Sequence, residues 1–295
     1  MQRVESEIAR LIKEIDYDEV TRLFGMLSGG KRLRAKLILK IAPHNDKAPL
    51  LAAIVELIHA ASLLHDDVID EATLRRGVAS VNATEDSKTA VMLGDILYSK
   101  AFTELVEFDR SVASVVASSV TALSKGEMQD VKMAESFNND EAKYLYMLYL
   151  KTATLIEAAA ISSAILAGKD SKSYGIYGRN LGLSFQIIDD ILDITSDSAT
   201  LGKPAMNDFV EGKCTLPYIY LHEAINSDDK LKLENLHARP LDEQEILWIK
   251  QMMKEHKSIE RSFELATKLS NEAMQAVKDD QELVEILKTM IKRSY

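Results

Sequence analysis

The stretch LLAAIVELIHAASLLHDDVID, residues 50–70, is an apolar run that ends abruptly in three carboxylates. The part before the carboxylates is almost entirely apolar, which predicts a buried helix. Burying one unpaired carboxylate is costly, and burying three side by side is worse. Asp66, Asp67 and Asp70 therefore need a partner that the apolar run does not supply.

The composition of the whole chain favours helices. Hydrophobic residues make up 46% of the 295 residues, and Gly and Pro number only 12 and 5. Helical spacing recurs along the chain, without alternating strand patterns, repeats or a Gly/Ser linker. We therefore predict an all-α fold, a single domain over residues 1–295 built as a bundle of ten or more helices. The predicted helices cover residues 2–15, 17–26, 30–42, 47–72, 88–107, 110–134, 140–167, 170–195 and 213–225, followed by about three amphipathic segments over 228–293, and residues 196–212 are predicted to be a long loop.

Charge and cysteine content exclude several classes of protein. A formal net charge of −10 argues against a nucleic-acid-binding protein, although local basic clusters could still bind phosphates. The single Cys214 rules out an intramolecular disulfide framework and fits a reducing cytoplasm. No apolar run approaches 18 residues, and the N-terminus lacks the apolar region of a signal peptide. We therefore expect a cytoplasmic protein with no transmembrane segment.

A second acidic motif, QIIDDILD at residues 186–193, repeats the spacing of the first. Residues three and four apart share one face of a helix, so the carboxylates of each motif repel one another unless a cation lies between them. Mg²⁺ prefers oxygen ligands and is usually held by one or two carboxylates together with substrate phosphates. One such motif alone is more often a solvated helix end. Two of them, each in an apolar run, predict a site where several metal ions bind a polyanion.

Basic residues lie near both acidic motifs in the sequence. Taken singly, each is more often a solvated surface charge, but in an acidic protein this grouping favours phosphate binding. A histidine two helical turns before Asp66 could donate to a diphosphate as well. These candidates are Lys31, Arg32, Arg34, His59, Arg75, Arg76, Lys151 with Thr152, Lys203 and Lys213.

The same stretches, in this order, resemble the trans (E-type) isoprenyl diphosphate synthases, also called the polyprenyl synthetase family. The resemblance covers residues 29–217 and rests on GGKRLR, HAASLLHDDVIDEATLRRG, GDILYSKAF, KGE, KTATLIEAA, GLSFQIIDDILD, LGKP and EGKCTLP. It implies an isoprenoid synthase fold, in which helices surround a central apolar cavity, and usually a homodimer. It also implies the condensation of isopentenyl diphosphate with an allylic diphosphate primer, assisted by Mg²⁺. The chain departs from the family at Ala35, where proline is usual, and at Met206, where glycine is usual.

The resemblance implies roles for individual residues. Asp66, Asp67, Asp70 and Asp189 would be catalytic metal ligands, with Asp190 and Asp193 supporting the metal site. Phe185 would line the reaction chamber, and Lys151 and Lys203 would act in catalysis. The allylic diphosphate would bind Arg75, Lys151, Thr152, Gln186, Lys203 and Lys213, and isopentenyl diphosphate would bind Gly30, Lys31, Arg34, His59 and Arg76.

The length of the product is predicted from the residues before the first acidic motif, which in this family form a floor for the growing chain. Ala61 and Ser62 are both small, whereas enzymes with short products tend to have an aromatic residue there. The predicted helix 47–72 would be about 39 Å long at 1.5 Å per residue, enough for about seven or eight isoprene units. The low-bulk segment 111–120 could form a facing wall. We expect a hexaprenyl to octaprenyl product, the kind that becomes a quinone side chain, and so apolar a product makes peripheral membrane contact plausible.

Three alternatives remain at this point. A class I terpene cyclase also ionises allylic diphosphates, but GGKRLR and the second Asp-rich motif count against it. A non-catalytic subunit of a heteromeric synthase would have no reason to keep both carboxylate clusters. A short-chain synthase, making farnesyl or geranylgeranyl diphosphate, is the strongest alternative within the same enzyme class.

Overall fold

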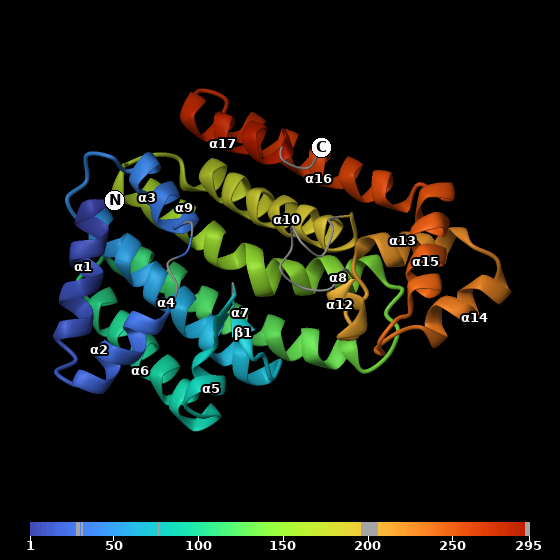
Figure 1. Ribbon diagram of the computed structural model, residues 1–295. Helices are drawn as coiled ribbons and strands as arrows, with labels where there is room; N and C mark the ends of the chain where they lie inside the picture. The colour runs from blue at the N-terminus through green and yellow to red at the C-terminus, as the bar shows by residue number, and fades with distance from the viewer. Residues whose placement is uncertain (28–29, 31, 76, 196–205, 293–295) are drawn as a thin grey trace. The chain divides into compact units, whose positions relative to one another are not determined.

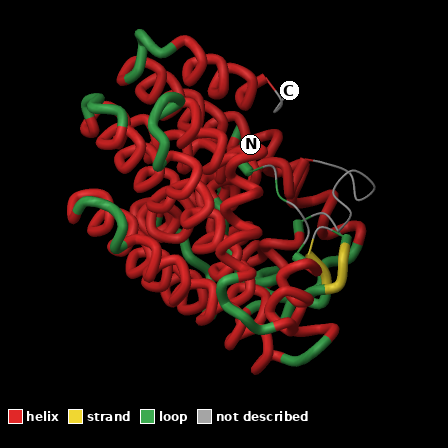
Figure 2. The backbone as a smooth tube through the Cα atoms, turned by 90° about the vertical axis from the view of Figure 1, so that its left-hand side faces the viewer, coloured by secondary structure: helices red, strands yellow, loops and turns green. Residues whose placement is uncertain are grey.

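The computed structural model describes residues 1–27, 30, 32–75, 77–195 and 206–292 (Figure 1). Helices account for nearly all regular structure in these residues, and Figure 2 shows a short strand pair as the exception. The prediction of an all-α fold is therefore confirmed. The chain forms two compact units, here called unit 1 (Met1–Thr121 and Leu155–Gly178) and unit 2 (Ala122–Thr154 and Arg179–Tyr295).

Most helices lie wholly within unit 1 or wholly within unit 2, and the remaining helices cross a boundary between the units. Unit 1 contains α1 (Gln2–Lys13), α2 (Asp18–Met26), α3 (Leu33–Ile41), α4 (Ala48–Ile69), β1 (Leu74–Arg75), β2 (Val78–Ala79), α5 (Val81–Thr84) and α6 (Ser87–Leu105). Unit 2 contains α8 (Glu141–Leu148), the π-helical turn η1 (Tyr149–Ala153), α12 (Asn207–Val210), α13 (Leu216–Ala224), α14 (Ser227–Asn235), α15 (Glu243–Glu255), α16 (Ser258–Ala276) and α17 (Gln281–Lys292). The boundaries fall within α7 (Arg110–Ala134), α9 (Thr154–Leu166) and α10 (Ser171–Thr195).

The apolar helix α4 is the centre of unit 1. It has a proline in its first turn, where the missing backbone N–H costs nothing, and residues 51–58 are all buried. Helices α6, α3 and α1 pack against it. The helix ends at Ile69, and Glu71 then takes a left-handed conformation (φ 49°), so the chain turns into the β1–β2 hairpin. This turn returns Arg75 toward the acidic end of α4.

Two apolar clusters of described residues lie in unit 2. One cluster joins α8, η1 and the second half of α10 to α13 and α16, with Ile187 and Leu216 at its centre. The other surrounds Phe209 of α12, which stacks on Tyr218 of α13 with ring centroids 4.2 Å apart. These clusters fix the part of α10 that carries the second acidic motif.

The structure corrects several sequence predictions. Residues 196–205 of the predicted loop 196–212 lie outside the described residues, and the described part contains the short helix α12. The described part of the tail forms four helices, α14 to α17, instead of about three. The β1–β2 hairpin and α5 were not predicted, because two-residue strands and a four-residue helix leave no periodic pattern. The predicted single domain stays a prediction.

Among the described residues, two helical segments, Ala48–Ile69 and Glu141–Leu166, are long and apolar enough to cross a membrane. The sequence has no uninterrupted apolar run of 18 residues, but the mean hydropathy of an 18-residue window stays high when a few polar residues interrupt the run. In each segment 67% of the most apolar window is buried within the protein. Core helices of water-soluble proteins pass the same test, so burial offers the simpler account of both.

Candidate active site

The first acidic motif is paired with a guanidinium. Arg75, on β1, donates from Nε to Asp67 Oδ1 at 2.5 Å and from Nη2 to Asp66 Oδ2 at 2.7 Å. The Asp67 carboxylate is almost completely buried, whereas Asp66 is half-buried and Asp70 is exposed at the end of α4. Burial raises the pKa of Asp67, and Arg75 partly offsets that rise. A guanidinium thus lies between two of these carboxylates, and the predicted metal ion stays a prediction.

The second acidic motif lies within α10, and its carboxylates have different surroundings. Asp189 is exposed, whereas Asp190 and Asp193 are buried. Asp190 accepts a hydrogen bond from the hydroxyl of Tyr144 and another, at 3.0 Å, from Gln186 Nε2. Burial, followed by the charge of Asp208, raises the pKa of Asp190. Neutral donors therefore hold this carboxylate.

Asp193 binds backbone N–H groups at the start of α12. Its Oδ2 accepts a hydrogen bond from the backbone N–H of Asp208 at 3.2 Å, and its carbonyl oxygen accepts one from Met206 at 2.9 Å. Met206 is buried in the left-handed conformation (φ 61°) that glycine adopts most easily. Met206, where the family usually has glycine, thus adopts the left-handed conformation that a glycine would adopt easily.

The π-helical turn η1 carries two of the predicted diphosphate-binding residues. Lys151 Nζ lies 3.0 Å from Glu127 and 2.6 Å from Asp130, both on α7. Thr152 Oγ1 donates to Gln186 Oε1 at 3.3 Å. The widened turn of a π-helix changes the direction of side chains within a helix, and such turns are frequent at functional sites. In unit 2 the structure therefore joins Thr152 to Gln186, whereas the ammonium of Lys151 pairs with carboxylates of α7.

Gly126 allows α7 to pack closely against η1. A Cβ atom on Gly126 would lie 2.4 Å from the backbone nitrogen of Lys151, closer than real Cβ contacts allow. The sequence analysis gives no role to Glu127 and Asp130. Their spacing of three residues on one helical face, just after a glycine, could have indicated a paired acidic site.

The region around GGKRLR is described only in part. Arg34 lies in the first turn of α3, which packs against α4, and His59 lies on the half-buried face of α4. Arg32 precedes α3 with φ 50° and pairs with Glu5 and with the buried Glu56, at 3.1 Å in each case. Glu56 also accepts a hydrogen bond from the backbone N–H of Ala35. Arg32 therefore secures the start of α3.

The remaining predicted residues are placed as follows. Lys213 pairs with Glu211 at 2.9 Å, and Phe185 is half-buried. Ala61 is fully buried, whereas Ser62 is half-buried on the same helical face as His59 and Asp66. Gly30 is described as a half-buried residue before α3. Lys31, Arg76 and Lys203 lie outside the described residues.

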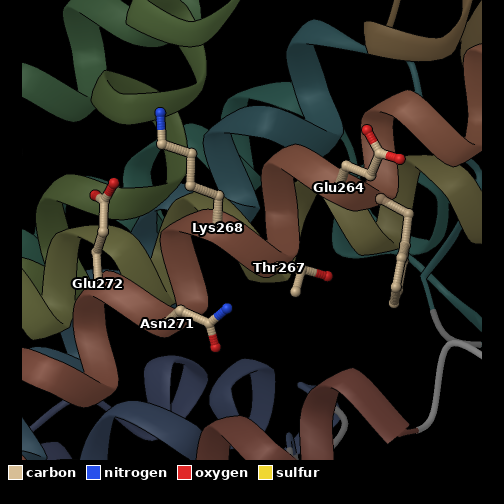
Figure 3. Close-up of a pocket in the computed structure, with 6 residues that line it drawn as sticks. Glu264, Thr267, Lys268, Asn271 and Glu272 are labelled. Carbon is tan, nitrogen blue, oxygen red and sulfur yellow. The ribbon is translucent and has the colours of Figure 1, made fainter.

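A pocket of about 530 Å³ lies along α16, away from any residue predicted to function. Figure 3 shows Glu264, Thr267, Lys268, Asn271 and Glu272 on one helix beside it. Glu272 accepts a hydrogen bond from Asn180 of α10 at 3.2 Å. The pocket has one aromatic wall residue, Phe263, and no predicted metal ligand, so it is not the candidate active site.

The donor atoms of the acidic motifs suit a hard divalent ion. Among the described residues, no three carboxylate, imidazole or thiolate groups converge on one point. A protein-only metal cage, as for Zn²⁺, would need such a group. Mg²⁺ commonly takes one or two carboxylates and completes its shell with phosphate oxygens and water. Exposed or half-buried carboxylates such as Asp66 and Asp189 fit that pattern.

Comparison with known proteins gives a consistent result. The family model described as polyprenyl synthetase matches residues 19–256. The octaprenyl diphosphate synthase of Haemophilus influenzae is 32% identical over 286 residues, which is 94% of this chain and 87% of that protein. The octaprenyl pyrophosphate synthase of Helicobacter pylori has a solved structure with a TM-score of 0.94 and 43% identity, covering 98% of this chain and 97% of that one. A polyprenyl synthase from Caulobacter crescentus, solved with calcium and isoprenyl diphosphate, has a TM-score of 0.83 and 30% identity over 98% of both chains.

Proposed function

The chain belongs to the polyprenyl synthetase family, and from this premise we propose that its two acidic motifs hold Mg²⁺ against the diphosphate of an allylic substrate. The protein is a polyprenyl diphosphate synthase, a trans-prenyltransferase that acts on isoprenoid diphosphates and builds medium-to-long products. Members of the family generally use a divalent metal. The choice of Mg²⁺ and the roles of single residues belong to the proposal.

Asp66, Asp67, Asp70 and Asp189 are the proposed metal ligands. These residues would hold Mg²⁺, which would supply Lewis-acid stabilisation of the diphosphate leaving group as the allylic carbon–oxygen bond breaks. The isopentenyl double bond would then form the new carbon–carbon bond, and a proton would pass to the released diphosphate. The observation that carries the proposal is the arrangement around the first motif, where Asp66 and Asp67 already share one cation, Arg75. A diphosphate that attracted the guanidinium would leave these carboxylates ready for metal.

The proposed diphosphate ligands are cations and hydrogen-bond donors. Arg75, Lys151 and Lys213 would neutralise the charge that develops on the allylic diphosphate, the electrostatic role that often contributes most to catalysis. Thr152 and Gln186 would fix its orientation, and Lys203 would be a further cation. Isopentenyl diphosphate would bind Gly30, Lys31, Arg34, His59 and Arg76. Asp190 and Asp193, whose oxygens already hold neutral donors, would support the ligands on α10.

Apolar residues would complete the reaction chamber and set the product length. Phe185, half-buried one residue before Gln186, would exclude water from the allylic cation. Ala61 and Ser62 would allow growth to a hexaprenyl to octaprenyl diphosphate, a precursor of quinone side chains. The decaprenyl diphosphate synthase of Rhodobacter capsulatus, 28% identical with a TM-score of 0.94, supports a product in the longer range.

One assay tests the proposal directly. The purified protein is incubated with Mg²⁺, isopentenyl diphosphate and a geranyl or farnesyl diphosphate primer, and the products are sized after removal of the diphosphate. We expect all-trans products of six to eight isoprene units and no product after chelation with EDTA. Absence of any elongated product would refute the proposal, and a farnesyl or geranylgeranyl product would favour the short-chain alternative.

A cytoplasmic homodimer is the proposed form of the enzyme. Exposed apolar side chains on α7, Met128 and Val131, one helical turn apart, support a covered surface there. Light scattering coupled to gel filtration should give twice the 32.9 kDa chain mass. Substituting Met128 by Glu should then shift the equilibrium toward monomer, and a monomeric parent protein would refute this part.

A further inference from the structure

Tyr144 is a buried polar residue that the reaction described above does not use. It lies on α8 with 2% of its surface exposed, and its hydroxyl donates a hydrogen bond to Asp190 Oδ2 of α10. Asp190 is 4% exposed. Burial disfavours the ionised tyrosine and raises its pKa well above the ordinary value, so the hydroxyl remains a donor. The bond therefore joins α8 to α10 in a place that water does not reach.

Asp190 passes this constraint to a proposed ligand of the primer. Its second oxygen, Oδ1, accepts from Gln186 Nε2 at 3.0 Å. This hydrogen bond turns the amide nitrogen of Gln186 toward Asp190 and its amide oxygen away. The amide oxygen of Gln186 then accepts from Thr152 Oγ1 at 3.3 Å. Each side chain in the series fixes the orientation of the next.

Tyr144 also precedes Lys151 and Thr152 on one continuous helical stretch. The hydroxyl anchors α8 to α10 one turn before η1 begins at Tyr149. The π turn then presents Lys151 and Thr152 next to α10. Tyr144 and Thr152, the two ends of the series, thus belong to one helical segment. Asp190 and Gln186 on α10 connect them through hydrogen bonds.

We propose that Tyr144 is a positioning residue for the allylic primer: through Asp190 it fixes the amide of Gln186 and the hydroxyl of Thr152. The inference rests on the proposed function, in which Thr152 and Gln186 contact the primer diphosphate. Without the tyrosine hydroxyl, one buried carboxylate oxygen loses its donor, and the carboxylate becomes free to rotate away from Gln186. The long side chain of Gln186 then loses the single orientation that a bound diphosphate requires.

The test uses Tyr144→Phe, which removes the hydroxyl and keeps the ring packing. The matched control is Tyr146→Phe on the same helix, where the ring is 48% exposed. We expect Tyr144→Phe to raise the KM for farnesyl diphosphate by about fivefold to tenfold, the size of one buried hydrogen bond. The KM for isopentenyl diphosphate should change by less than about twofold, and the control should change neither value.

The split between the two KM values separates positioning from general loosening of the fold. An equal rise in both values, or no rise in the primer KM, would overturn the inference. A cycle with Gln186→Ala gives a second measurement: Tyr144→Phe should have almost no further effect in that background, because both changes act through one amide. Independent, additive effects would contradict the series.

The same cycle distinguishes the inference from the proposed function on which it rests. If Gln186→Ala and Lys151→Ala both leave the primer KM unchanged, the proposed primer site is wrong and the inference falls with it. If those variants raise the primer KM while Tyr144→Phe does not, the primer site stands and only the role of Tyr144 is refuted. Thermal melting of each variant confirms that the folded protein is being assayed.

Discussion

At the end of α4 the first acidic motif is paired with a guanidinium, whereas inside α10 the second is held by neutral donors. Arg75 bridges Asp66 and Asp67. On α10, a tyrosine hydroxyl, a glutamine amide and a backbone N–H occupy the oxygens of Asp190 and Asp193. The spacing of the aspartates is the same in both motifs, so their surroundings make the difference.

The difference shows that one sequence pattern can have two kinds of surroundings. A partly exposed carboxylate such as Asp66 can exchange its guanidinium partner for a metal ion, because solvent and ligands reach both charged groups. A buried carboxylate with fixed neutral donors instead holds helices and side chains in place. In the second motif only Asp189 is exposed, so it is the carboxylate of α10 best suited to metal.

The largest effect is expected from removing the exposed ligand of each motif. Asp66→Ala and Asp189→Ala should each lower kcat by about a thousandfold or more, because charge on the departing diphosphate loses its metal counterpart. Glu260→Ala, an exposed carboxylate on α16, is the matched control and should keep full turnover. Steady-state product formation measures all three. A variant that retains a tenth of the parent's kcat would remove its residue from the metal site.

A smaller effect is expected from the guanidinium that distinguishes the first motif. Arg75→Ala should raise the KM for the primer by about tenfold to a hundredfold, since a charge-assisted contact is lost. Arg75→Lys should recover only part of it, because an ammonium cannot make the two-pronged contact to Asp66 and Asp67.

The same variant tests whether metal and guanidinium compete. With Arg75 removed, Asp66 and Asp67 lose their shared cation, so added Mg²⁺ should raise the melting temperature more than it does in the parent protein. Differential scanning fluorimetry with and without Mg²⁺ gives the comparison. An equal rise in both proteins would show that the two cations do not share these carboxylates.

Much of this arrangement could be predicted from the sequence, for identifiable reasons. Helical periodicity located the long helices, and the apolar run before Asp66 marked α4 as buried. The paired motifs predicted metal ions and a polyanion, because carboxylates at that spacing repel one another. The resemblance to the family identified the polyanion as a diphosphate. The roles assigned to single residues of the candidate site remain predictions.

What the sequence could not provide is which carboxylates are buried and by what they are held. Tyr144 lies 46 residues before Asp190, and no local pattern links them. Asp189 and Asp190 are adjacent in sequence, yet one is exposed and the other buried, because neighbouring helical residues point in directions about 100° apart. The positive φ of Met206 was likewise hidden, since a methionine does not indicate a left-handed turn.

A further prediction concerns the glycine that brings α7 to η1. Gly126→Ala would place a Cβ 2.4 Å from the nitrogen of Lys151, so the turn that carries Lys151 and Thr152 must shift. We expect about a tenfold fall in kcat/KM for the primer and a loss of about 1–3 kcal/mol in the free energy of unfolding. Gly25→Ala is the control, because a Cβ there meets nothing within 4 Å. Unchanged kinetics in Gly126→Ala would show that η1 need not be held this closely.

The last comparison concerns the residues just before each motif, where the smallest effect on rate is expected. Five and four positions before the first aspartate stand Ala61 and Ser62 in α4, but Ser184 and Phe185 in α10. Placing an aromatic ring before the first motif should therefore shorten the product while leaving primer consumption within about threefold of the parent. Ser62→Tyr extends from a half-buried face, whereas Ala61→Tyr must displace buried neighbours and should also lower the melting temperature. Chromatography of the dephosphorylated products measures the chain length, and melting curves separate the two variants. If both folded variants made products as long as the parent's, Ala61 and Ser62 would not form the floor of the chamber. The small residues before Asp66 and the aromatic residue before Asp189 would then differ only in how they pack between helices.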